Sequence, residues 1–128
     1  MRVIVDTHVF FWWLIVDEGL SARALEILEN EENEVLISSV VAWELATKSR
    51  IGKWPDGKIV AEKIEEYLAS YELRQLPITI AHAQLGGLMP GVHKDPFDRI
   101  LAAQARLEGI PLVTSDRALR EFGIEILW

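Results

Sequence analysis

The sequence predicts a single α/β domain whose mainly parallel sheet is covered by helices on both faces. Short β-branched segments alternate with stretches of helical periodicity along the whole chain, and this alternation is typical of strand–helix–strand units. Half of the 128 residues are hydrophobic and 26% are charged, which is an ordinary globular balance. No linker, repeat or low-complexity tract divides the chain, so we assign residues 1–128 to one domain.

The first part of the chain predicts two strands and three helices. Strands are expected at Arg2–Val5 and Glu34–Ile37, where β-branched and apolar residues gather. Helices are expected at Val9–Val16, Ala22–Asn30 and Val40–Arg50, and a serine precedes each of the last two as a favourable N-cap. The Val9–Val16 helix is apolar on all sides, so we expect it to be buried in the core or in a subunit interface.

The middle of the chain predicts a turn, a long amphipathic helix, a strand and a shorter helix. The turn is Trp54–Gly57, with proline and glycine at favourable places. The long helix that follows carries apolar residues at Ile59, Ile64, Leu68 and Tyr71. A short strand is expected at Leu73–Leu76 and a brief helix from the Thr79 cap to about Leu85. Gly86–Lys94, with three glycines and a proline, predicts a loop.

The last part of the chain opens with a clear helix start. Asp95 is a favourable N-cap and Pro96 suits the first helical position, so a helix should run to Glu108 and stop at Gly109. The remaining expected elements are a strand at Ile110–Thr114, a short helix at Asp116–Phe122 and a strand at Ile124–Trp128.

Composition excludes several classes of protein. The chain has no cysteine, so disulfides, thiolate metal sites and cysteine nucleophiles are excluded. The longest apolar run, Val9–Val16, is far shorter than the roughly 20 residues that span a bilayer. Asp6 and His8 interrupt the only stretch that could serve as a signal peptide, so we expect a cytoplasmic protein.

The net charge of −7 counts against nucleic-acid binding through a broad basic surface. It does not exclude such binding, because bound divalent cations reverse the sign of a local site. An acidic chain also suits a basic protein partner.

Two aspartates follow predicted strands. Asp6 comes directly after the first strand and Asp116 after a late one. In open parallel sheets the ligand site lies beyond the carboxyl ends of the strands, so both side chains reach one crevice if those strands are neighbours. For either aspartate alone, a turn residue or a helix cap is the favoured interpretation.

Two further acids lie on apolar helix faces. Glu44 shares a face with Val40 and Val41, and a buried carboxylate is costly unless it is paired or bound to a metal. An ion pair with Lys48, four residues on, is the structural alternative.

Asp98 lines up with the apolar residues Leu101, Ala102 and Ala105, a stripe that should face the sheet. The helix dipole stabilises an acid near a helix start, but it does not explain the inward direction of this one.

Four acids directed to one end of the sheet repel each other, so the cluster needs cations. Oxygen ligands without cysteine favour Mg²⁺ or Mn²⁺. In proteins such ions activate water and stabilise leaving oxygens in phosphoryl chemistry. His8 and His93 are candidate ligands, although a lone histidine is more often a hydrogen-bonded neighbour.

The short motifs around these acids resemble one family. They are Val5-Asp6-Thr7-His8, Ser38-Ser39 with Trp43-Glu44, His93-Lys94-Asp95-Pro96-Phe97-Asp98-Arg99 and Thr114-Ser115-Asp116. In this order, over nearly the whole chain, they resemble the PIN-domain ribonucleases, and most of all the VapC-type toxins of bacterial and archaeal toxin–antitoxin pairs.

The resemblance implies a three-layer α/β/α fold and Mg²⁺- or Mn²⁺-dependent endonuclease activity on RNA. The family's acidic positions fall on Asp6, Glu44, Asp98 and Asp116. Asp95 matches the helix-capping position, and Thr7 and Ser115 match polar positions that support the metal site. The resemblance also implies a homodimer and a cognate antitoxin, whose tail can place an arginine among the acids.

We therefore formulate a mechanism as a hypothesis. Asp6 and Asp98 would hold the main ion, while Glu44 and Asp116 would bind a second ion or orient the attacking water. Because water rather than the ribose hydroxyl attacks, the products should carry 5′-phosphate and 3′-hydroxyl ends.

Substrate contacts must come from local positive charge. Candidates cluster at the end of the Glu44 helix and beside the acids: Lys48, Arg50, Lys53, Lys94, Arg99 and Arg117. Lys48, Arg50 and Arg99 are the leading candidates for phosphate contacts. Solvated surface charge is the favoured interpretation of each one alone, and an internal salt bridge is a further alternative for Arg99. Trp12 and Trp13 could stack on bases, but burial in the core or a dimer contact is the favoured interpretation.

Other folds place acids at strand ends. A receiver domain should have two adjacent acids after its first strand and a lysine after a late one, where this chain has Asp6-Thr7 and Ser115-Asp116. A haloacid-dehalogenase-type phosphatase needs a second aspartate where His8 stands. The non-enzymatic alternative is an acidic binding module that docks a basic partner peptide.

Overall fold

The computed structural model describes all 128 residues and contains one five-stranded sheet. The strand order is β3-β2-β1-β4-β5, and every neighbouring pair is parallel. The strands are β1 (Arg2–Val5), β2 (Glu34–Ser38), β3 (Arg74–Leu76), β4 (Leu112–Val113) and β5 (Ile126–Leu127). The prediction of a parallel α/β sheet is confirmed, although the last two strands are shorter than the sequence indicated.

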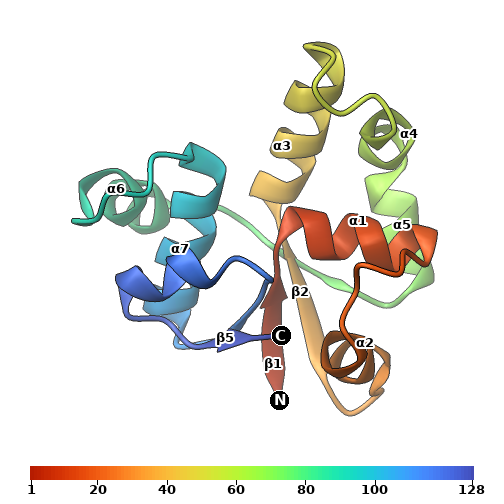
Figure 1. The fold of residues 1–128 in the computed structure, drawn as a ribbon, viewed down its shortest axis with the longest axis horizontal. Helices are drawn as coiled ribbons and strands as arrows, with labels where there is room; N and C mark the ends of the chain where they lie inside the picture. The colour runs from red at the N-terminus through yellow and green to blue at the C-terminus, as the bar shows by residue number, and fades with distance from the viewer.

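Helices follow the strands in the expected order (Figure 1). They are α1 (Thr7–Ile15), α2 (Ala22–Glu29), α3 (Ser39–Arg50), α4 (Gly57–Glu62), α5 (Ile64–Ser70), α6 (Ile80–Leu88), α7 (Pro96–Glu108) and the 3₁₀ helix η1 (Arg117–Phe122). Short polar side chains cap most helix starts, as the predicted caps Ser21, Thr79 and Asp95 do. None of these helices has both the length and the apolar character that crossing a bilayer requires.

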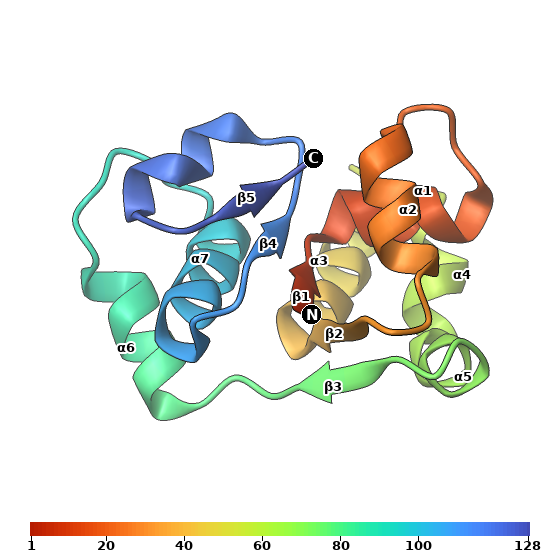
Figure 2. The same ribbon diagram turned by 90° about the horizontal axis from the view of Figure 1, so that it is seen from below.

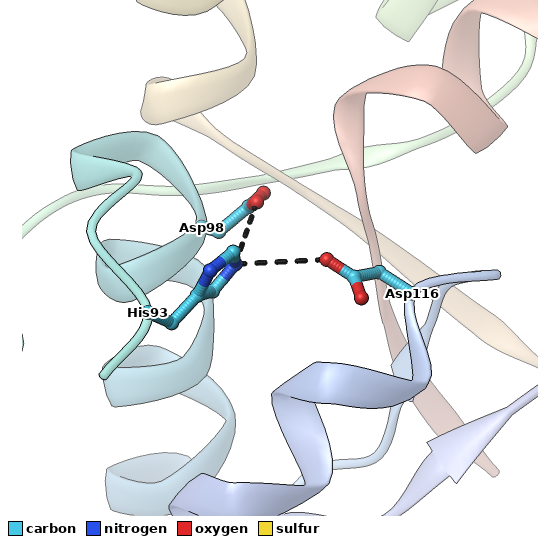
Figure 3. A group of neighbouring side chains, drawn as sticks. All are labelled: His93, Asp98 and Asp116. Atoms are coloured by element: carbon cyan, nitrogen blue, oxygen red, sulfur yellow. Dashed lines mark hydrogen bonds and ion pairs between the residues drawn. The ribbon is translucent and has the colours of Figure 1, made fainter. Parts of the chain in front are cut away.

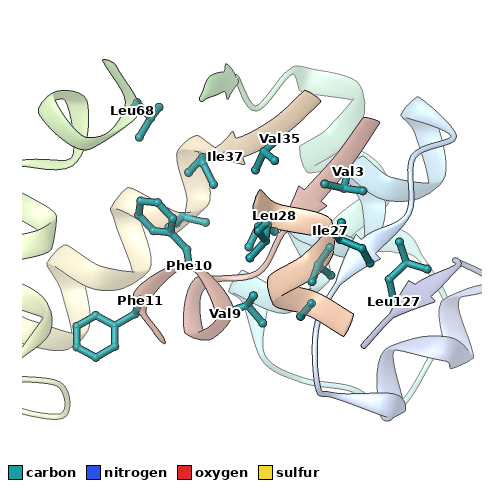
Figure 4. Close-up of a cluster of buried hydrophobic side chains, with 14 of the residues drawn as sticks. Val3, Val9, Phe10, Phe11, Ile27, Leu28, Val35, Ile37, Leu68 and Leu127 are labelled. Atoms are coloured by element: carbon teal, nitrogen blue, oxygen red, sulfur yellow. The ribbon is translucent and has the colours of Figure 1, made fainter. Parts of the chain in front are cut away.

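Alternate residues of the strands build two cores, one on each face of the sheet. Val3 and Val5 pack with α1 and α2 in the core of one face, which Figure 4 shows in part. Ile4, between them, packs instead with Leu101 of α7 and Leu112 in the other core. In Figure 2 the α1, α2, α4 and α5 group lies on one side of the sheet and α6 and α7 on the other. The three-layer α/β/α arrangement is thus confirmed.

The predicted long helix after the Trp54–Gly57 turn is wrong, because the chain breaks at Lys63 into α4 and α5. Val60 is buried against the core and Ile59 is exposed, so the apolar face of α4 is not the one that the sequence suggested. The break lets α4 pack against α3 while Leu68 of α5 reaches the core of the sheet.

Two other expectations need correction. The predicted loop Gly86–Lys94 begins later, because α6 continues to Leu88. An added Cβ at Gly86 would lie 3.1 Å from Ile100 of α7, so this glycine permits close packing of the two helices. The apolar helix α1 ends at Ile15, which is 49% exposed, so it is not buried on all sides within one chain; its burial in a subunit interface stays a prediction.

Candidate active site

The neighbouring strands β1 and β4 bring two of the predicted acids together. Val5 pairs with Val113 in the sheet, so Asp6 and Thr114 follow side by side. Asp6 caps α1 by accepting a hydrogen bond from the Val9 N–H at 2.8 Å through Oδ1. The condition set from the sequence, that the two strands be neighbours, is confirmed.

Thr114 is the residue that the sequence reasoning missed. Its buried hydroxyl donates a hydrogen bond to Asp6 Oδ2 and accepts one from the Asp116 backbone N–H at 3.1 Å. Asp116 in turn caps η1 by accepting from the Ala118 N–H at 3.0 Å. One threonine therefore fixes both strand-end aspartates. Within the Thr114-Ser115-Asp116 motif, the resemblance indicates Ser115 as the residue that supports the metal site, but Ser115 is exposed and Thr114 makes the contacts with the two aspartates.

His93 lies between two of the acids (Figure 3). Its Nε2 is 3.0 Å from Asp98 Oδ2 and 3.6 Å from Asp116 Oδ2. One ligand atom from each of these three residues lies within 4.8 Å of the others, close enough to share a metal ion. The histidine is thus a hydrogen-bonded neighbour of the acids, and also a candidate ligand.

Glu44 is the remaining candidate acid. It is only 2% exposed and lies among the buried residues Val40 and Val41, as its helix face predicted. It forms the anticipated ion pair with Lys48. Burial lowers the pKa of Lys48, but the hydrogen bond and charge of Glu44, with the charges of Asp95 and Asp98, outweigh it and leave the pKa raised. The Lys48–Glu44 pair therefore lies beside the other acids, because the charges of Asp95 and Asp98 at the start of α7 act on Lys48.

The acids influence one another strongly. Burial raises the pKa of Asp6 to about 6, with help from the charges of Glu44 and Asp116 and against hydrogen bonds from Thr114 and Val9. Burial likewise raises the pKa of Asp98 to about 6, and the charges of Asp95, Glu44 and Asp6 add to it. Such a cluster of carboxylates is stabilised by a bound cation.

The residues present fit a hard divalent cation. The donors are carboxylate oxygens with one imidazole nitrogen, which suits Mg²⁺ and Mn²⁺ rather than thiophilic metals. The buried hydroxyl of Thr7, next to Asp6 in the chain, has no hydrogen-bond partner within the protein. A buried hydroxyl of this kind normally has one, so it fits a role beside a hydrated ion.

The basic candidates do not form one patch. Arg99 donates hydrogen bonds to the carbonyls of Gly86 and His93, both at 2.8 Å, and of Met89. It also lies over the Phe122 ring, 5.2 Å from its centroid. This placement favours a structural role, in which Arg99 holds the segment before α7, over a phosphate contact.

The side chains of Lys48 and Arg50 lie in different places. Lys48 lies beside the acids, whereas Arg50 lines a separate groove between α3 and α4, together with Lys58. Of the two, only Lys48 is therefore placed beside the candidate site.

Comparisons with known proteins agree with this geometry. The family model described as "PIN domain" matches residues 3–125. Ribonuclease VapC22 of Mycobacterium tuberculosis (strain ATCC 25618 / H37Rv) is 30% identical over 129 residues, covering 92% of this chain and 89% of that protein.

Two solved structures share the fold. VapBC2 from Rickettsia felis, bound to a DNA fragment from its promoter, matches 99% of this chain and 98% of its own with a TM-score of 0.69 and 17% identity. FitAcB from Neisseria gonorrhoeae matches 98% and 96% with a TM-score of 0.67 and 18% identity. The chain belongs to the PIN-domain family, among the VapC-type ribonucleases.

Proposed function

We propose that this chain is the toxin of a VapBC-like toxin–antitoxin pair, a Mg²⁺- or Mn²⁺-dependent endoribonuclease that hydrolyses RNA phosphodiester bonds. The observation that carries the proposal is the convergence of acids from four elements. Asp6 and Asp116 follow β1 and β4, Glu44 comes from α3 and Asp98 from α7. Burial, with the charges of neighbouring acids, raises the pKa of both Asp6 and Asp98 to about 6.

The protein residues have distinct roles in this proposal. Asp6, Asp98 and Asp116 would hold the ion, with Glu44 as a further carboxylate at the same edge. Thr114 fixes the carboxylate of Asp6. When bound, the ion lowers the pKa of a water molecule and stabilises negative charge on the leaving oxygen.

Neighbouring groups position the acids. His93 orients Asp98 through its hydrogen bond and holds Asp116 close to Asp98 through the second, longer contact of Nε2. Arg99 and Glu121 hold the His93 segment, Glu121 by accepting from the His93 N–H at 3.0 Å. Thr7 and Ser115 remain proposed supporting residues.

Hydrolysis by water makes a prediction about products. The nucleophile adds to phosphorus and the 3′ oxygen leaves, so the cut RNA carries 5′-phosphate and 3′-hydroxyl ends. Ends with a 2′,3′-cyclic phosphate would contradict the proposal, because they form when the ribose hydroxyl attacks.

The acidic cluster also suits an inhibitory partner. The solved structure with the same fold named VapBC2 is bound to a DNA fragment from its promoter, and the resemblance to VapC-type toxins supports a cognate antitoxin for this chain. A basic side chain of such a partner would neutralise the same carboxylates as a metal ion does. The homodimer stays a prediction.

The test is cleavage of total cellular RNA by purified protein freed of any partner, with Mn²⁺ and with chelator. Asp98→Asn is the inactive variant, and Asp17→Asn, at an exposed position, is the control. We expect discrete cuts that chelator and Asp98→Asn abolish and Asp17→Asn does not. If Asp98→Asn cuts as wild type does, or if no cuts form, the acids serve a non-catalytic module that docks a basic peptide.

A further inference from the structure

A second feature lies beside the acids, where α1, the end of α3 and the turn before α4 meet. It is a hollow of about 500 Å³, which we call the aromatic hollow. This volume is within the range of small-molecule sites. Its walls consist of four ring side chains, two lysines and one aspartate, namely His8, Phe11, Trp12, Trp54, Lys48, Lys53 and Asp95.

One pair of these rings is stacked, and the other two rings contact that pair at an angle. His8 lies flat on Trp54, with ring centroids 4.6 Å apart and an angle of 19° between the planes. The buried Phe11 supports Trp54 edge-on at 5.0 Å, and Trp12 is tilted 6.0 Å from His8. His8 is exposed and the two tryptophans are half-buried. Flat rings that solvent reaches can extend their stack with another flat ring, such as a nucleobase.

The aromatic hollow is joined to the catalytic acids by three of its own residues. His8 is two residues beyond Asp6, Lys48 forms the ion pair with Glu44, and Asp95 is three residues before Asp98. A ligand in the aromatic hollow would therefore lie next to the phosphate that is cleaved at the acids.

Charge favours an anionic ligand. Lys53 is exposed and supplies an unpaired positive charge, whereas the charge of Lys48 is balanced by Glu44. The opposing Asp95 is engaged in capping α7, where Oδ1 accepts from the Phe97 N–H at 2.9 Å. The unpaired charge of Lys53 would repel a basic segment of a protein partner, whereas it attracts a phosphate of RNA.

We propose that the aromatic hollow is a nucleobase subsite, which takes one unpaired base of the RNA substrate next to the cleaved phosphate. The base extends the His8–Trp54 stack, and Lys53 contacts the adjoining phosphate. The inference rests on the proposed ribonuclease function and deepens it, because it names the residues that hold one base of the substrate.

Binding tests the subsite without cleavage. In an Asp98→Asn background, fluorescence anisotropy compares a short single-stranded oligoribonucleotide with an abasic ribose-phosphate chain of the same length. Loss of one stacked base should weaken binding at least about fivefold. We expect His8→Ala to weaken binding of the intact oligonucleotide by this factor and leave the abasic chain unaffected, and Lys53→Ala to weaken both.

The matched control is Lys58→Ala, an exposed lysine in the groove between α3 and α4, which contains no aromatic ring. We expect it to bind both probes as the background does. His8→Ala and Lys53→Ala that also behave like the background would overturn the subsite, and so would an equal loss of both probes in His8→Ala.

Cleavage separates the two proposals. With an otherwise wild-type chain, His8→Ala should lower kcat/KM on single-stranded RNA by the same factor, with an unchanged Mn²⁺ requirement. If the wild type does not cut RNA while the base-dependent binding persists, the ribonuclease proposal fails and the subsite stands. If the wild type cuts and His8→Ala and Lys53→Ala cut like Lys58→Ala, the subsite fails and the ribonuclease stands.

Discussion

Asp98→Asn should stabilise the metal-free protein while it abolishes cleavage. The pKa of Asp98 is raised from 3.8 to about 6 by burial and by neighbouring acids. One pKa unit corresponds to about 1.4 kcal/mol, so the ionised carboxylate destabilises the fold by about 3 kcal/mol at most. Its side chain is 23% exposed, so we expect a gain of about 1–3 kcal/mol when asparagine removes the charge.

The stability gained by Asp98→Asn should increase with pH. Because the pKa of Asp98 is higher in the folded than in the unfolded chain, its contribution to stability is fully present below pH 3.8 and is lost as the pH rises through about 6. The gain from Asp98→Asn should therefore be small at about pH 4 and largest at about pH 8. Asparagine still accepts the hydrogen bond from His93, so the geometry is retained.

Urea unfolding in chelator at the two pH values measures this effect. Asp17→Asn is the matched control, since Asp17 is exposed and its Oδ1 accepts from the Gly19 N–H at 2.7 Å, which an asparagine can replace. Mn²⁺ at a thousandfold excess over Kd should reverse the order, because ligand binding then adds about 4.1 kcal/mol to the wild type, more than the expected gain of the variant. An Asp98→Asn variant that is less stable than wild type in chelator at pH 8, or equally stabilised at both pH values, would refute the reasoning.

Three further substitutions test neighbouring contacts. Thr114→Val removes the hydroxyl that lowers the pKa of Asp6. The free energy of unfolding should fall by about 1–3 kcal/mol, and the pH of half-maximal cleavage should rise. A pH profile of cleavage identical to that of the wild type would contradict this. Arg99→Ala removes donors from three carbonyls, so urea stability and cleavage should both fall, and recovery of both by Arg99→Lys would argue against this geometry. Lys48→Met leaves the buried Glu44 unpaired, and urea unfolding in chelator should show a loss of about 1–3 kcal/mol, whereas unchanged stability would show that the pair is not needed.

The placement of the candidate acids could be predicted because local sequence patterns indicate it. Asp6 follows a β-branched run, and Asp98 continues the apolar stripe of Leu101 and Ala102, which is buried as expected. The Lys48–Glu44 ion pair follows from i, i+4 spacing on a helix. In each case neighbours in the sequence determine the direction of the side chain.

The supporting contacts could not be predicted, because they join residues far apart in the chain. The hydrogen bond of Thr114 to Asp6 depends on the register of β1 with β4, which no local pattern specifies. The stack of His8 on Trp54 requires α1 to meet the turn before α4. The break at Lys63 has the same origin, since packing on α3 and on the sheet outweighs helical periodicity.

The structure also explains how an acidic chain can act on RNA. The positive charges do not cover a surface; instead Lys48 and Lys53 line one hollow beside the carboxylates. A bound divalent cation would reverse the charge at the acids themselves. Affinity for RNA should therefore depend on the metal as well as on the two lysines.

Anomalous diffraction from crystals soaked in Mn²⁺ tests the central claim most directly. The account predicts a manganese peak among the carboxylates of Asp6, Asp98 and Asp116, within ligand distance of at least two of them, and no such peak in Asp98→Asn crystals. A peak elsewhere on the protein, or none at these carboxylates at saturating Mn²⁺, would contradict the claim that the converging acids form a metal-dependent active site.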